Sequence, residues 1–289
     1  MFKGFRLEYV DLGEVTLRVR HGGTGSPVVL LHGHPRTHTT WHQVALRLAE
    51  HHTTVVPDLR GYGRSSLPPD EPGHRQSSKR AMAHDVVRLM AHLGHDRFAV
   101  VGHDRGSLVA FRTAMDHSER VSHLVVMDGL PVIEHLERTD AGFAQAWWHW
   151  WFMGQTDKPA ERVICADPEA WYRTPAPQIM GEGNHADLWA ALRDPDVVHG
   201  MCEDYRAGLR ADRDDDAADR VAGRQVQCPA LLLESAHDDL DIHGDPAAIW
   251  QPWLARPLQH RVIDSGHHQA EEAPDAVADA LLEFVRDTG

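Results

Sequence analysis

Short, continuous apolar runs alternate with amphipathic stretches along much of the chain. Runs at residues 27–31, 53–57, 98–101 and 121–127 have the length and composition of strands that are buried on both faces. Residues 77–93 lie between two of these runs and carry apolar side chains at the spacing of an amphipathic helix. Strands and helices that alternate in this way predict a mostly parallel sheet with helices on both of its faces.

Further elements are expected on either side of this pattern. Residues 5–12 and 14–21 alternate between apolar and polar side chains, which predicts an antiparallel hairpin. Helices are expected at residues 41–49 and from residue 107 to about residue 117. Near the end of the chain the spacing predicts strands at 229–233 and 260–264 and helices at 247–254 and 274–286.

The alternation of strands and helices stops after Pro131. From there to about Arg224 the chain is rich in tryptophan and in helical patterns, without a convincing strand. We therefore expect an α/β core made of residues 1–130 and 226–289, interrupted by a helical cap at residues 131–225. An insertion that follows the end of a strand is expected to cover the carboxyl edge of the sheet, where such folds bind ligands.

The most informative motif is the pentapeptide at residues 102–106, Gly-His-Asp-Arg-Gly. It follows the strand at 98–101 and precedes a helical pattern, which is the arrangement of a nucleophile elbow with Asp104 at its centre. Gly102 and Gly106 suit a turn so tight that a Cβ atom at either position would collide with the backbone. We interpret Asp104 as a nucleophile that attacks saturated carbon, since a carboxylate needs no proton removed first.

The ends of later strands supply the partners that this nucleophile needs. His267 follows the strand at 260–264 and is expected to be the base that activates water against the ester of Asp104. An acid must orient His267, and either Asp128 or the later group at residues 238, 239 and 241 could do so. Backbone N–H groups of His34 and Arg105 are expected to hold the oxyanion.

Composition narrows the classes of partner. The formal net charge of −14 argues against nucleic acids and anionic membranes, and no stretch is long and apolar enough to span a bilayer. Three cysteines without metal-type spacing indicate reduced thiols and a cytoplasmic location. The 23 histidines form no metal-binding motif, so neither a metal nor a cofactor is expected. The acidic stretch at residues 212–219 is expected to be a solvent-exposed face.

Several motifs together resemble the fluoroacetate (haloacetate) dehalogenases of the α/β-hydrolase superfamily, over nearly the whole chain. The motifs shared across that superfamily are residues 31–35, 58–65, 102–106 and 265–267 with 271–274. The more discriminating ones are the Asp-Arg pair of the elbow, His149-Trp150, and Glu-Asp-Tyr-Arg-Ala at residues 203–207. The resemblance implies a homodimer that acts on a small molecule and hydrolyses the carbon–halogen bond of short 2-haloacids through an aspartyl ester.

The resemblance also implies roles for individual residues. Asp104 would be the nucleophile, His267 the base, and Asp128 the acid that orients His267. The halide pocket would be formed by His149, Trp150 and Tyr205. The substrate carboxylate would be bound by Arg105. Donors from imidazole, indole and phenol groups suit the departure of fluoride, which is a poor leaving group.

One position departs from the family pattern. Leu108 stands where the family usually has a second arginine, one helical turn after the nucleophile. Loss of a charge-assisted bidentate partner would weaken carboxylate binding by about 1.5–3 kcal/mol. Arg36 follows His34-Pro35 and is a candidate substitute, with an ordinary surface arginine as the other interpretation.

Two other functions remain open from the sequence. An epoxide hydrolase would use the same nucleophile, base and acid, with two cap tyrosines donating to the epoxide oxygen, and Tyr172 and Tyr205 are available. Epoxide hydrolases and haloalkane dehalogenases usually have tryptophan after the nucleophile, whereas this chain has Arg105. A catalytically silent ligand receptor is the third possibility, and a complete set of Asp, acid and His argues against it.

Overall fold

The structure is a computed structural model that describes residues 1–172 and 174–286. Within these residues, one eight-stranded sheet has the order β1-β2-β4-β3-β5-β6-β7-β8. Its strands are β1 (Arg6–Asp11), β2 (Thr16–Gly22), β3 (Pro27–Leu31), β4 (Thr53–Pro57), β5 (Phe98–His103), β6 (Val121–Met127), β7 (Ala230–Ser235) and β8 (Gln259–Ile263). Strands β1, β2 and β4 pair antiparallel and all other neighbours pair parallel, which confirms the predicted α/β fold with a mostly parallel sheet.

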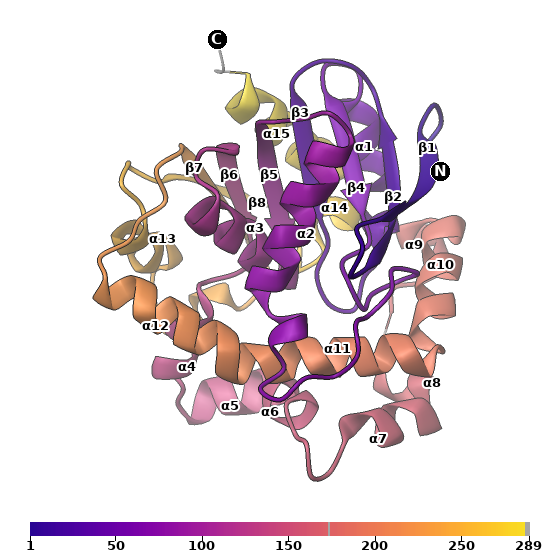
Figure 1. Ribbon diagram of the computed structural model, residues 1–289, viewed down its shortest axis with the longest axis vertical. Coiled ribbons are helices and arrows are strands. Elements are labelled where there is room, and N and C mark those ends of the chain that lie inside the picture. Colours follow the sequence, from indigo (N-terminus) through magenta and orange to yellow (C-terminus); the bar gives the residue numbers. More distant parts are fainter. Residues whose placement is uncertain (173, 287–289) are drawn as a thin grey trace.

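Helices cover both faces of the sheet (Figure 1). They are α1 (His42–Leu48), α2 (Lys79–His92), α3 (Arg105–Asp116), α13 (Pro246–Trp250), α14 (Gln269–Glu272) and α15 (Pro274–Val285). Side chains of the central strand β3 alternate between two apolar cores. Val29 and Leu31 pack in the core that includes α2 and α3, while Val28 and Leu30 pack in the core that includes α1 and α15. This two-sided burial explains why the central strands are continuous apolar runs.

A helical insertion separates β6 from β7. It contains α4 (Val132–Glu137), α5 (Ala141–Ala146), α6 (His149–Met153), α7 (Ala160–Ala166), α8 (Pro168–Trp171), α9 (Pro177–Met180), α10 (Glu182–Leu192), α11 (Pro195–Ala207) and α12 (Arg213–Val221). The insertion falls inside the segment 131–225 that we expected to be a separate cap, and the division into core and cap stays a prediction. None of the described helices combines the length and apolarity that a bilayer crossing requires.

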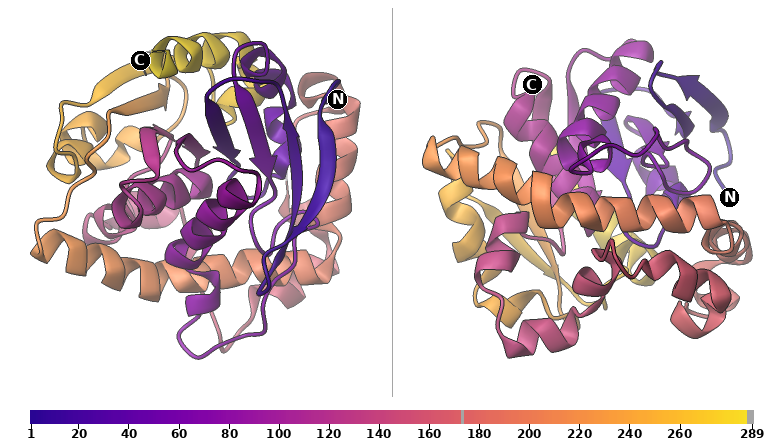
Figure 2. Two further views of the ribbon diagram at one scale, coloured as in Figure 1. Left: turned by 45° about the horizontal axis from the view of Figure 1, so that its top comes forward. Right: turned by 60° about the horizontal axis from the view of Figure 1, so that its bottom comes forward.

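Helices α11 and α12 form one long rod. The π-helical turn Gly208–Asp212 joins them without a break, and we call residues 195–221 the α11–α12 rod. Figures 1 and 2 show this rod crossing one end of the sheet, next to α2 and α3. The rod therefore connects the insertion with the helix that begins at the predicted nucleophile.

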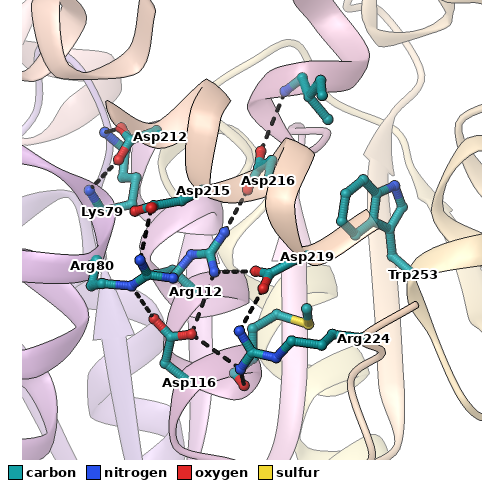
Figure 3. A network of polar contacts seen from close by, with 12 residues as sticks. Lys79, Arg80, Arg112, Asp116, Asp212, Asp215, Asp216, Asp219, Arg224 and Trp253 are labelled. Carbon is teal, nitrogen blue, oxygen red and sulfur yellow. Dashed lines mark hydrogen bonds and ion pairs between the residues drawn. The ribbon is translucent and has the colours of Figure 1, made fainter. Parts of the chain in front are cut away.

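The acidic stretch of the rod is not the solvent-exposed face that we expected. Four of its aspartates are buried and form ion pairs with basic side chains of α2 and α3 (Figure 3). They are Asp212, Asp215, Asp216 and Asp219. Counted from Asp212, these four aspartates lie at positions i, i+3, i+4 and i+7 and so share one face of the helix. Arg112 of α3 lies at the centre of this network, where Asp216 and Asp219 both accept hydrogen bonds from it.

Candidate active site

Asp104 sits at the turn between β5 and α3, as the elbow motif predicts. Its backbone has φ 52° and ψ −120°, a strained conformation of the kind that clusters at functional sites. A Cβ atom on Gly102 would collide with the backbone of Gly106, and one on Gly106 would collide with the backbone at Leu31 and His32. The two glycines thus permit the close packing that presents the Asp104 side chain above the sheet.

Two backbone N–H groups hold the Asp104 carboxylate. The His34 N–H donates to Oδ1 at 2.6 Å, and the Arg105 N–H also donates to this carboxylate. Gly33 leaves room for this contact, since a Cβ atom there would collide with the Asp104 side chain. Burial raises the pKa of Asp104, although the positive charges of His267 and Arg105 and these N–H groups oppose the shift. His34 and Arg105 therefore occupy the positions expected of oxyanion donors.

His267 lies between two carboxylates. Its Nδ1 is 2.7 Å from Oδ2 of Asp238, and its Nε2 is 3.8 Å from Oδ2 of Asp104. Burial works to lower the pKa of His267, but the hydrogen bond with Asp238 and the nearby negative charges raise it to about 9. At pH 7 the resting site therefore holds His267 as an imidazolium next to Asp104.

Asp128 does not make the contact with His267 that we predicted for the acid. Its Oδ1 accepts from the Ser235 N–H at 2.8 Å, and its Oδ2 accepts from the Ser235 hydroxyl and from Nε2 of Gln269. Burial raises the pKa of Asp128 to about 6, against the positive charge of His267 and the hydrogen bonds from Ser235 and Gln269, which favour its charged form. The carboxylate that bonds His267 in this structure is Asp238, which belongs to the later group that the sequence left open.

A cavity of about 260 Å³ opens above Asp104. It is lined by His34, Pro35, Asp104, Ala146, Trp147, His149, Tyr205, Asp238, Asp239, His267 and His268. Three of the predicted substrate-binding residues, His34, His149 and Tyr205, are therefore brought together with the nucleophile. Such a volume lies just below the range of pockets that hold drug-sized ligands, about 300–1,000 Å³, and suits a small molecule.

Trp150 packs behind the cavity wall, against Tyr205. Its ring stands edge-on to Tyr205 with the ring centroids 6.0 Å apart, and it is not among the lining residues. The His149 ring also meets Tyr205 edge-on, at 5.8 Å. Burial lowers the pKa of His149 to about 4 and that of His34 well below its ordinary value, so both rings are neutral at pH 7.

The two arginines expected at the substrate carboxylate are both engaged elsewhere. Arg105 donates from Nε to Oδ2 and from Nη2 to Oδ1 of Asp204, at 3.0 and 2.8 Å. Arg36 forms a similar buried pair with Glu271, with two contacts of 3.0 Å, which corrects both the idea of a free substitute cation and that of a surface arginine. Neither side chain lines the cavity, and Nη1 of Arg105 is buried without a hydrogen-bond partner among the described residues.

The second tyrosine that an epoxide hydrolase would need is not in the cavity wall. The Tyr172 hydroxyl donates to the sulfur of Met201 at 3.4 Å, and the residue is buried. Its ring contacts His34 with the centroids 5.9 Å apart. Of the two tyrosines that the sequence offered, only Tyr205 faces the nucleophile.

Several residues of the site escaped the sequence reasoning. Trp147 and His268 line the cavity without a role assigned from the sequence, and Trp147 donates from its indole at 3.0 Å to Asp239, one of the later group of candidate acids. His268 directly follows the predicted base, so its position in the chain was the available signal. Asp204 lies within the Glu-Asp-Tyr-Arg-Ala motif but received no role of its own.

Groups of possible metal ligands overlap the site. His103, His267 and His268 lie close together, as do Asp128, Asp238 and His267, and a third group elsewhere joins Asp70, His199 and Glu203. In the first group, Nε2 of His103 already donates to the His267 carbonyl at 2.6 Å. In the second, Nδ1 of His267 is bonded to Asp238. In each of these two groups, one nitrogen atom is thus already engaged in a hydrogen bond that involves His267.

Comparison with known proteins agrees with this geometry. The family model for the alpha/beta hydrolase fold matches residues 26–274, so the chain belongs to the α/β-hydrolase fold family. A fluoroacetate dehalogenase from Burkholderia sp is 40% identical over 99% of this chain and 96% of its own. Within the α/β hydrolases, the chain belongs to the haloacetate dehalogenase family that the sequence motifs indicated.

Other relatives show the breadth of this superfamily. A soluble epoxide hydrolase from Corynebacterium sp. (strain C12) is 31% identical over 98% of this chain and 95% of its own. Among solved structures, a putative alpha/beta hydrolase from Nostoc sp PCC 7120 superposes with a TM-score of 0.95 at 36% identity, covering 99% of this chain and all of its own.

Proposed function

We propose that this enzyme hydrolyses the carbon–halogen bond of short 2-haloacids, releasing halide and a 2-hydroxyacid through an ester of Asp104. The observation that carries the proposal is the placement of the two Asp104 oxygens. Oδ1 is held by the His34 N–H at 2.6 Å, whereas Oδ2 lies 3.8 Å from Nε2 of His267. One oxygen is thus positioned by an oxyanion site and the other lies on the side of the base. The fluoroacetate dehalogenase relative at 40% identity supports this choice of substrate.

In the first step, a carboxylate oxygen of Asp104 attacks the carbon that carries the halogen. A carbon–oxygen bond forms, the carbon–halogen bond breaks, and the halide leaves with the bonding electrons. We assign the stabilisation of that halide to donors from Tyr205 and His149, which line the cavity. Trp150 is included from the family resemblance alone, because in this structure its ring packs against Tyr205 and does not line the cavity. By the family resemblance, the substrate carboxylate is assigned to Arg105, whose Nη1 has no hydrogen-bond partner among the described residues. Arg105 does not line the cavity in this structure, so this assignment requires its guanidinium to turn toward the substrate.

In the second step, water attacks the carbonyl carbon of the ester and His267 takes the proton. Formation of the ester removes the negative charge of Asp104, which is one of the causes that raise the pKa of His267. The pKa of His267 is therefore lower once the ester exists, so the ring can lose its proton and act as the base. The oxyanion is held by the N–H groups of His34 and Arg105, and its collapse releases the hydroxyacid, whose alkoxide oxygen takes the proton from His267. The proton that remains on Asp104 then passes to His267, which restores the starting carboxylate and imidazolium.

We propose Asp238 as the acid that orients His267, in place of Asp128. Asp238 makes the 2.7 Å contact with Nδ1, while both oxygens of Asp128 accept hydrogen bonds from other residues. We further propose, from the family resemblance, that residues 131–225 act as a cap and that the enzyme is a homodimer. A cytoplasmic location is proposed from the three free cysteines.

A substrate panel tests the proposed function. Fluoroacetate, chloroacetate, 2-halopropionates and styrene oxide are incubated with the enzyme, and released halide and diol are both measured. Halide release from the haloacids, lost in Asp104→Asn, is the expected result. Diol from styrene oxide without halide from any haloacid would instead establish an epoxide hydrolase.

A further inference from the structure

Asp204 is a fully buried carboxylate that contacts three polar side chains and directly precedes the predicted halide donor Tyr205. Its carboxylate accepts hydrogen bonds from Arg105 and from Tyr62 Oη, the latter at 2.7 Å, and it is also paired with Lys79. Its backbone carbonyl accepts a further hydrogen bond from Nη2 of Arg105 at 2.8 Å. The positive charges of Arg105 and Lys79 hold the pKa of Asp204 well below its ordinary value, despite complete burial.

These contacts join the α11–α12 rod to the start of the nucleophile helix. Asp204 and Tyr205 are neighbours on α11, while Arg105 is the residue directly after Asp104. The guanidinium of Arg105 also lies over the Tyr205 ring, 4.3 Å from its centroid. One arginine therefore fixes the rod through Asp204 and supports the ring of Tyr205 at the same time.

We infer that Asp204 is a positioning residue that sets the place of the Tyr205 hydroxyl relative to Asp104. This inference rests on the proposed dehalogenase function. It makes Asp204 a residue that determines which leaving groups the enzyme handles well. Fluoride needs hydrogen-bond donation as it departs more than bromide does, because fluoride is the poorer leaving group. A displaced Tyr205 hydroxyl would accordingly slow defluorination more than debromination.

The test compares two leaving groups in one variant. Asp204→Asn keeps the size of the side chain and removes the charge that holds Arg105 and Lys79. The ratio of kcat for fluoroacetate to kcat for bromoacetate is expected to fall about tenfold, the effect of weakening one hydrogen bond to a developing anion. This ratio does not depend on the fraction of enzyme that is folded, so general destabilisation alone leaves it unchanged.

Asp219→Asn provides a matched control. Asp219 is also a buried aspartate of the rod that pairs with an arginine of α3, in this case Arg112, but it lies in the network of Figure 3, away from the cavity lining. It is expected to lower stability and to keep the wild-type ratio. If Asp204→Asn gives no folded protein, Tyr62→Phe removes a single donor to the same carboxylate and is expected to lower the ratio by a smaller factor.

The outcomes separate this inference from the proposed function. Halide release by the wild type with an unchanged ratio in Asp204→Asn, or in Tyr62→Phe if that variant replaces it, would overturn the positioning role alone. An equal fall of the ratio in Asp219→Asn would also overturn it, since any loosening of the rod would then suffice. A wild type that releases no halide from either substrate would overturn the proposed function and this inference together.

Discussion

Replacement of Asp238 by asparagine should separate the two chemical steps of the proposed reaction. The hydrogen bond between Asp238 and Nδ1 of His267 is 2.7 Å long, and both side chains are largely buried. A charge-assisted hydrogen bond of this kind contributes about 1.5–3 kcal/mol. At about 1.4 kcal/mol per pKa unit, its loss would lower the pKa of His267 by about one to two units.

The larger effect of Asp238→Asn is expected on the orientation of the ring. An asparagine at this position can favour the wrong tautomer of the imidazole, and in a related triad such a change costs about ten-thousandfold in rate. Hydrolysis of the Asp104 ester should slow to a comparable degree. Formation of the ester should continue, because the Asp104 carboxylate attacks carbon without the help of a base.

The assay is rapid-quench measurement of halide release from chloroacetate, with intact-protein mass spectrometry on the same samples. Asp238→Asn should release one halide per active site in a burst, and the ester should accumulate as a protein of higher mass. Asp128→Asn should show steady turnover without a burst, since Ser235 and Gln269 hold that carboxylate. A burst in Asp128→Asn together with normal turnover in Asp238→Asn would refute this reasoning and restore Asp128 as the acid.

Three further outcomes are expected. Hydrolysis of the Asp104 ester, followed in a single turnover, should become faster with rising pH and level off below pH 9. The pKa of His267 is about 9 in the free enzyme, and the ester removes the negative charge of Asp104 that helps to raise it. A rate that falls over this pH range would contradict the role of His267 as base. Arg36→Gln should lower the free energy of unfolding by about 3–5 kcal/mol, because it leaves the buried charge of Glu271 without its positive partner. Urea denaturation of this variant and of the double variant with Glu271→Gln should show that the second substitution recovers most of the loss. Burial raises the pKa of Asp216 to about 7, so the contribution of this group to stability should fall as pH rises from 4 to 7. The difference in the free energy of unfolding between the wild type and Asp216→Asn, measured by urea denaturation, should therefore shift in favour of the variant over this range. A difference that does not change with pH would show that the charge of this group carries no such cost.

The backbone of the site could be predicted from the sequence because simple steric and periodic rules govern it. Continuous apolar runs marked the buried strands, and Gly102 and Gly106 marked the tight turn that presents Asp104. The N–H groups of His34 and Arg105 followed from the positions of the two strand ends. These features depend on local chain geometry, which the order of residues largely determines.

The choice of acid depended on side chains that the sequence does not distinguish. Asp128 and Asp238 follow neighbouring strands of the sheet, and ligand atoms of both lie within 4.8 Å of one on His267. Ser235 and Gln269 donate hydrogen bonds to both oxygens of Asp128. Neither residue lies in a sequence motif that would have indicated this contact. The outcome is therefore set by tertiary contacts between distant segments.

The partners of the arginines were missed for the same reason. Arg105 and Asp204 are 99 positions apart, so their pairing appears only when the rod packs against α3. The acidic stretch did contain a usable signal, because Asp212, Asp216 and Asp219 share one helical face. A row of carboxylates on one face indicates a basic partner as readily as it indicates solvent.

The attachment of the rod to α3 also determines what can be exchanged between relatives. Asp204 pairs with Arg105 near the start of α3, and Asp216 and Asp219 pair with Arg112 farther along the same helix. A chimera that received only residues 131–225 from an enzyme without acidic side chains at these positions would leave both arginines buried without partners. For such a donor, the unit of exchange is the insertion together with α3, so a change of substrate range by recombination must carry the nucleophile helix with it.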